Sequence, residues 1–179
     1  GGNLQKFHPL FEGIVRIIIF VAYMALVSRM KDIHRVFMYH GAEHKTIFCY
    51  EHGLPLTVEN VRKQSRFHPR CGTSFMFVMI ILSILLSSAL VLIFPGLQNV
   101  NRAVWILVKL LVLPLVMGIG YEFIKYAGKH DNLLVKILSA PGLWMQRITT
   151  QEPTDDIIEV GIASLKAVIT DNPEDDEIK

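Results

Sequence analysis

Three long apolar segments dominate the hydrophobic pattern of the chain, at residues 11–30, 75–95 and 103–123. The clearest of them, residues 75–95, carries no charge over about twenty positions, which is the length needed to cross a hydrocarbon core of roughly 30 Å. A buried helix of a soluble protein is the alternative for such a segment. The pattern therefore predicts an all-α membrane protein with about three transmembrane helices.

Polar residues modify this prediction for two of the segments. Lys109 lies near one end of its segment and can extend toward the headgroups, while Pro114 would kink the helix. Glu12 and Arg16 stand near the start of residues 11–30, which makes this segment the weakest span. A half-buried amphipathic helix is the alternative there.

Basic residues gather in the connection between the first two spans. Within residues 28–74 they are Arg29, Lys31, Arg35, Lys45, Arg62, Lys63, Arg66 and Arg70. The turn at 96–102 holds one basic residue, Arg102. By the positive-inside rule, we expect a motif region at 31–74 and the part after residue 123 on the cytoplasmic side of a bacterial cytoplasmic membrane.

The motif region is predicted to contain short helices and a loop. Residues 33–51 follow a helical pattern despite Gly41, and Thr57 is a suitable N-cap for a second short helix. A proline and a glycine within residues 67–74 indicate a loop, whose threonine and serine are candidate caps for the next span.

Residues 130–170 are predicted to form an interfacial helix followed by a cytosolic one. Trp144 would lie at headgroup level in the first of these. Thr154 is the expected N-cap of the second, an amphipathic helix that presents apolar residues on one side. Residues 171–179 form an acidic tail, and the pattern predicts one membrane domain over residues 1–179.

Composition narrows the classes of partner. The chain is 51% hydrophobic with a formal net charge of +2, so we expect membrane lipid as a partner and no nucleic acid. Its two cysteines cannot make a disulfide framework, and each is a core thiol or a ligand. The Gly-Gly start without methionine is typical of an excised or processed fragment, so a missing targeting signal carries no weight.

The sequence HGAEH at residues 40–44 is the clearest candidate for chemistry. On a helix, His40 and His44 lie on one face and can present two imidazoles to one metal ion. Glu43 is the residue type that would activate water, and the spacing H-x-x-E-H is that of inverted zinc proteases. A polar helix face that meets headgroups and solvent is the alternative.

Three further residues are candidates to complete a metal site. His68 and Cys71 stand three apart on a proline-containing loop, and nitrogen and sulfur ligands suit tetrahedral zinc. Glu122 ends the third span on the same predicted side of the membrane. The alternatives are a buried thiol at Cys71 and an ordinary helix-end acid at Glu122.

Other residues near the motif have weaker claims. Glu51 lies roughly 10 Å beyond His44 along the helix, so it would support the site, serve a second metal, or be a surface acid. Arg66 and Arg70 are candidates for anion binding, with lipid phosphate as the alternative partner. Cys49 is expected in the core.

Three blocks of the sequence resemble the DUF1385 family of YqhQ-like bacterial membrane proteins, which has plastid relatives. These blocks are RVFMYHGAEHKTIFCYE, LTVENVRKQSRFHPRCGTSF and PGLWMQRITTQEPTDDIIEVGIASL, within a match over about residues 10–170. Family members usually carry a longer N-terminal portion, which this chain is expected to lack. The resemblance implies a metal-dependent enzyme whose motif positions are His40, Glu43, His44, Glu51, His68 and Cys71.

We therefore expect a membrane-embedded hydrolase with zinc or another divalent metal, acting on a peptide or a lipid-related ester at the cytoplasmic surface. The alternative is a non-catalytic membrane scaffold or assembly factor with a structural His/Cys metal site. Three protein ligands with an open position would favour the enzyme, and four ligands would favour the scaffold. A transporter fits less well, because the spans hold few polar residues. Since three spans leave little room to enclose a site, a homo-oligomer is also expected.

Overall fold

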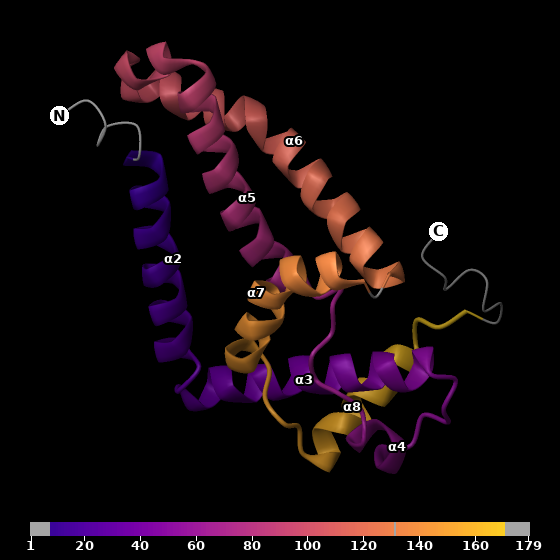
Figure 1. Cartoon of the computed structure of the whole chain (residues 1–179). Coiled ribbons are helices and arrows are strands. Elements are labelled where there is room, and N and C mark those ends of the chain that lie inside the picture. Colours follow the sequence, from indigo (N-terminus) through magenta and orange to yellow (C-terminus); the bar gives the residue numbers. More distant parts are fainter. Residues whose placement is uncertain (1–7, 131, 171–179) are drawn as a thin grey trace. The chain divides into compact units, whose positions relative to one another are not determined.

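The computed structural model describes residues 8–130 and 132–170, and the regular elements of this part of the chain are all helices (Figure 1). The elements in chain order are α2 (His8–Val27), α3 (Lys31–Glu51), α4 (Val58–Arg62), α5 (Gly72–Ile93), the 3₁₀ helix η1 (Pro95–Asn99), α6 (Arg102–Lys129), α7 (Leu133–Thr149) and α8 (Asp155–Lys166). The described residues contain no strand, so the predicted all-α class is confirmed. The predicted acidic tail at 171–179 lies outside the described residues.

Three of these helices are long and apolar enough to cross a membrane, as predicted. The qualifying stretches are Leu10–Val27 in α2, Phe75–Ile93 in α5 and Arg102–Ala127 in α6, with mean hydropathies of 2.2, 2.9 and 2.3. At most 17% of any stretch is buried within the protein. Apolar helices that remain so exposed would meet lipid in a bilayer, where their backbone hydrogen bonds are satisfied internally.

Helix ends differ by a few residues from the sequence-based boundaries, most of all at α6. This helix continues to Lys129, because no proline follows residue 123 to end it sooner. α5 begins at Gly72, and its N-cap residue is Cys71, whose side chain does not cap the backbone of the helix, so the expected cap by the following threonine or serine is wrong. The Phe75 N–H already donates to Cys71 O at 3.0 Å, which starts the helix before either hydroxyl.

The described chain falls into two compact units, whose boundaries cut α2 and α7. The first unit comprises the residues up to Tyr23 together with residues 70–142. Within it, α5 and α6 lie side by side and are joined through η1 (Figure 1). Gly120 of α6 permits their close approach, because a methyl group there would overlap Met79 of α5.

The second unit comprises residues 24–69 and the chain from 143 onward, and α8 packs in it along α3 and α4. Thr57 caps α4 as predicted, by accepting the Asn60 N–H at 3.3 Å. Cys49 is fully buried, as expected, and its burial raises the pKa of the thiol. The core cluster consists of Cys49, Val61, Ile158 and Ile162, with Leu56 and Val58 packed against it. This core fixes α8 against the helix that carries HGAEH.

Candidate metal centre

α3 places His40 and His44 on one face, one helical turn apart. Their ring centroids are 4.4 Å apart, and the rings meet edge to face at 67°. His44 is only 3% exposed, and His40 is half-buried. Such burial does not fit a helix face that simply meets solvent, because buried imidazoles need polar partners.

Each of the two rings is oriented by a backbone carbonyl. The Nδ1 atom of His40 lies 2.8 Å from Thr149 O, and that of His44 lies 2.6 Å from Arg66 O. A carbonyl oxygen only accepts hydrogen bonds, so Nδ1 of each neutral ring carries the proton and Nε2 carries the lone pair. Metal sites use this arrangement to fix the tautomer and the direction of a histidine ligand.

Gly41, between the two histidines, is required because another segment crosses α3 there. A methyl group at this position would overlap the carbonyl oxygen of Gln151. The Gln151 N–H donates to Phe37 O at 2.8 Å, which ties the crossing segment to the helix. Thr149, two residues earlier, supplies the carbonyl that orients His40. A residue that weakens a helix by propensity therefore permits the contact that positions the first candidate ligand.

His68 is held in the loop before α5 by a buried glutamine of α7. Gln146 accepts the His68 N–H at 2.7 Å through Oε1 and donates to His68 O at 2.6 Å through Nε2. The His68 ring centroid lies 5.7 Å from that of His44 and 4.5 Å from that of Phe48. The Nε2 atom of His68 is 3.4 Å from Glu51 Oε2, so Glu51 contacts this histidine.

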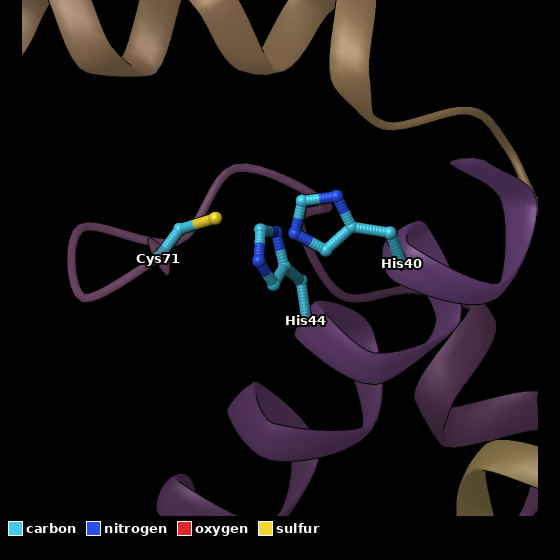
Figure 2. A group of neighbouring side chains, drawn as sticks. All are labelled: His40, His44 and Cys71. Carbon is cyan, nitrogen blue, oxygen red and sulfur yellow. The ribbon is translucent and has the colours of Figure 1, made fainter. Parts of the chain in front are cut away.

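Cys71 is buried and follows His68 by three residues. It lies near the start of the 70–142 part of the first unit, directly after the loop that holds His68. Figure 2 draws it together with His40 and His44, and the three side chains have the donor atoms that a metal ion takes. Two neutral imidazoles and a thiolate suit zinc, and three such ligands leave one tetrahedral position for water or substrate. The residues present therefore fit a metal ion.

A groove of about 620 Å³ opens between α3 and α8. His40 and the exposed Glu43 line it from α3, and Gly161 and Ser164 line it from α8. The remaining lining is mostly apolar and includes Val36, Tyr39, Ile47, Val160, Leu165 and Val168. The groove therefore brings a carboxylate and a candidate metal ligand to the wall of a space that can hold a partly apolar molecule.

Charged side chains fix the segment that crosses α3. Lys45 is 5% exposed, donates to Arg62 O at 3.0 Å and pairs with Glu152 at 2.9 Å. Arg66 donates to the carbonyl oxygen of Thr150, and its Nε lies 3.4 Å from Glu152 Oε1. The guanidinium of Arg66 is thus engaged within the protein, and the backbone carbonyl of the same residue orients His44.

The predicted site residues outside the cluster take other positions. Glu122 is exposed on α6 in the first unit. Arg70 is partly buried, and desolvation lowers the pKa of its guanidinium. Glu51 contacts His68, one of the candidate ligands. The ligand and anion-binding roles of these residues stay predictions.

Two residues that build the site were missed by sequence reasoning. Thr149 acts through its backbone carbonyl, and a carbonyl is present at every position, so the sequence carries no signal for it. Gln146 had a signal, because it is an uncharged polar residue within the apolar stretch GLWMQ. A buried amide must be hydrogen-bonded, so a residue of this type on the inner face of a helix indicates a partner in the fold.

The fold and the site define a helical protein with three helices of membrane-spanning length and two neighbouring histidines held by backbone carbonyls. The chain belongs to the DUF1385 family, described as a protein of unknown function, whose model matches residues 3–171. It is similar to the uncharacterized protein YqhQ of Bacillus subtilis (strain 168), with 40% identity over 170 residues. That alignment covers 93% of this chain and 51% of the relative, so the chain spans about half the relative's length. No solved structure matches the chain.

Proposed function

We propose that the chain carries the metal site of a membrane-associated, metal-dependent hydrolase, with zinc as the favoured metal. The supporting observation is the paired anchoring of His40 and His44, whose Nδ1 atoms both lie against backbone carbonyls while both Nε2 atoms carry the lone pair that a metal needs. Cys71 is the proposed third ligand. Three protein ligands favour catalysis, because structural zinc sites are closed by four.

Glu43 is the proposed general base. Its exposed carboxylate lines the groove one turn from His40, where it can meet both water and a bound substrate. It would accept a proton as the water oxygen attacks a carbonyl carbon, and return that proton to the leaving oxygen or nitrogen as the bond breaks. Zinc held by the proposed ligands would supply Lewis-acid activation of the carbonyl.

The surroundings of the site favour a substrate from the membrane. The mostly apolar groove suits a molecule with a hydrocarbon portion, such as a peptide segment or a lipid-related ester. The span-length helices would keep the chain in a bilayer, and the basic residues of the 28–74 connection favour the cytoplasmic side for the site. We therefore propose hydrolysis at the cytoplasmic face of a bacterial membrane.

His44→Ala is expected to abolish stoichiometric metal binding, because it removes a buried ligand whose ring is fixed in place. Wild-type protein purified in mild detergent should hold about one zinc per chain by mass spectrometry of the metal, and the variant less than about a tenth of that. His52→Ala is the matched control, since His52 is exposed at the end of α3 and contacts Gln64. The proposal is wrong if the wild-type protein still holds no metal after zinc has been added.

Glu43→Gln is expected to keep the metal and lose hydrolysis by about 100-fold or more, because the amide cannot accept a proton. Suitable probes are a nitrophenyl ester of a medium-chain fatty acid and dye-labelled casein. Glu59→Gln is the control, since Glu59 is an exposed acid that pairs with Lys63 on α4. Equal activity of the Glu43 variant and the wild type would exclude this residue as the base.

A non-catalytic scaffold with a structural metal is the second candidate, and His68 is the observation that favours it. This histidine is buried, and its ring lies 5.7 Å from that of His44, so it would close a four-ligand site with His40, His44 and Cys71. The same metal measurement separates the two functions. His68→Ala retains the zinc if the site is that of a hydrolase and loses it if the site is structural.

A further inference from the structure

A second polar site lies among the apolar helices of the first unit. A cavity of about 130 Å³ is bounded by α2, α5 and α6. Glu12 and Arg16 line it from α2, Ser83 and Ser87 from α5, and Lys109 from α6. None of these five residues belongs to the metal cluster, and all lie in helices that are long and apolar enough to cross a membrane.

These polar residues lie at one level along the helices. Arg16 is eight residues from the start of α2, Lys109 seven residues from the start of α6, and Ser87 six residues before the end of α5. At 1.5 Å per residue, each lies roughly 10 Å inward from the same end of the three helices. That depth is near the boundary between headgroups and hydrocarbon, where long basic side chains reach toward phosphates.

The charges lining this cavity do not balance. Arg16 forms an ion pair with Glu12 on the next turn of α2. The Nζ atom of Lys109 lies 5.3 Å from the ring centroid of Trp105. Lys109 also interacts electrostatically with both Arg16 and Glu12. Two cations and one acid leave one excess positive charge, and an excess charge is costly beside hydrocarbon unless an anion joins it.

A close contact between α2 and α5 helps to shape the cavity. Gly13 is buried where α2 meets α5, and a methyl group there would overlap the side chain of Ile84. Both residues line the cavity. The glycine therefore lets the turn of Glu12 and Arg16 approach α5. There the Ser87 hydroxyl can donate to an anionic oxygen, whereas the Ser83 hydroxyl donates to Ile80 O at 2.8 Å.

We propose that this cavity binds a phosphate group, presented by the headgroup of an anionic phospholipid. Arg16 and Lys109 supply charge-assisted hydrogen bonds, Ser87 supplies a neutral donor, and Glu12 keeps the Arg16 guanidinium in place. The depth of the site favours a lipid over a soluble phosphate, since the acyl chains can extend along the exposed apolar faces of the helices.

Trp105 provides a direct measurement, because its partner Lys109 would turn toward a bound phosphate. In a Trp144→Phe background, Trp105 is the remaining tryptophan of the chain. Titration of detergent-solubilised protein with dihexanoyl phosphatidylglycerol is expected to change its emission saturably. Arg16→Met and, independently, the cavity-filling Ser87→Leu should each weaken this binding by about tenfold or more. Lys125→Met removes a cation from α6, the helix of Lys109, at a position outside the cavity. This variant should bind the lipid as tightly as the parent protein does.

Two further titrations identify the source of the phosphate. A saturable change in Trp105 emission on titration with inorganic phosphate, absent from the Arg16→Met and Ser87→Leu variants, would support the site and identify a soluble anion as its ligand. Dihexanoyl phosphatidylcholine, which has no net charge, is expected to bind at least about tenfold more weakly than phosphatidylglycerol. The proposal is overturned if no anion gives a saturable change, if phosphatidylcholine binds equally well, or if Arg16→Met and Ser87→Leu both bind like the parent protein.

Discussion

Gly41→Ala is expected to lower the midpoint of thermal unfolding by about 6–12 °C and to release most of the bound metal. The alanine methyl would overlap the carbonyl oxygen of Gln151, which is backbone and cannot rotate aside. The crossing segment must then leave α3, or the helix must deform. Either change breaks the hydrogen bond from Gln151 N–H to Phe37 O and the one from His40 Nδ1 to Thr149 O.

The size of this effect follows from opposing contributions to the free energy of unfolding. Overpacking in a close contact costs about 1–3 kcal/mol, and each lost hydrogen bond costs about 1 kcal/mol. Alanine returns about 1 kcal/mol through its better helix propensity. The net loss is about 3 kcal/mol, and for a chain of this length each kcal/mol lowers the midpoint by about 2–4 °C.

Gly118→Ala is the matched control for this prediction. Gly118 lies within α6, and a methyl group there would meet nothing within 4 Å. Its midpoint should equal that of the wild type or exceed it slightly, because only helix propensity changes. Equal midpoints for the two variants would contradict the crossing contact at Gly41. A destabilised Gly41 variant that keeps its full metal content would show that the Thr149 carbonyl is not what orients His40.

The parts of the fold that could be predicted are those set by local periodicity. Apolar length identified the three span-length helices, although two of them carry charged residues. The threonine before VENVR predicted the cap of α4, because capping depends on residues only three apart. His40 and His44 could be placed on one face from their spacing alone. Each of these predictions rests on residues within about one helical turn or one apolar segment.

The parts that could not be predicted depend on contacts between distant segments. His40 and the carbonyl that orients it are 109 residues apart, and His44 and its carbonyl are 22 apart. Every residue has a backbone carbonyl, and the sequence does not show which one accepts a given hydrogen bond, so neither contact could be inferred. Gly41 illustrates the same limit, because local propensity marks it only as a weak point of α3, and its purpose emerges from the segment that crosses there.

Gln146→Leu is expected to be at least as damaging as Gly41→Ala, with a loss of about 4 kcal/mol in the free energy of unfolding. Leucine has nearly the volume of glutamine but offers no hydrogen bond. The backbone N–H and C=O of His68 would both lose their partner in a buried position, and each such group costs about 1–3 kcal/mol. The midpoint of thermal unfolding should fall by about 8–16 °C.

Metal affinity in the Gln146 variant tests whether this loop supports the site. Arg66, whose carbonyl orients His44, and Cys71 lie within three residues of His68, so a displaced loop should weaken zinc binding by about 10–100-fold in a competition titration with a chelator. Gln64→Leu is the control, since Gln64 is only partly buried and contacts the exposed His52. It should change the midpoint by no more than about 2 °C. If the Gln146→Leu protein unfolds at a lower temperature but binds zinc as tightly as the wild type, this glutamine stabilises the fold without positioning the metal ligands. Parallel losses of stability and affinity would mean that the buried amide stabilises the fold and positions the metal ligands through the same two hydrogen bonds.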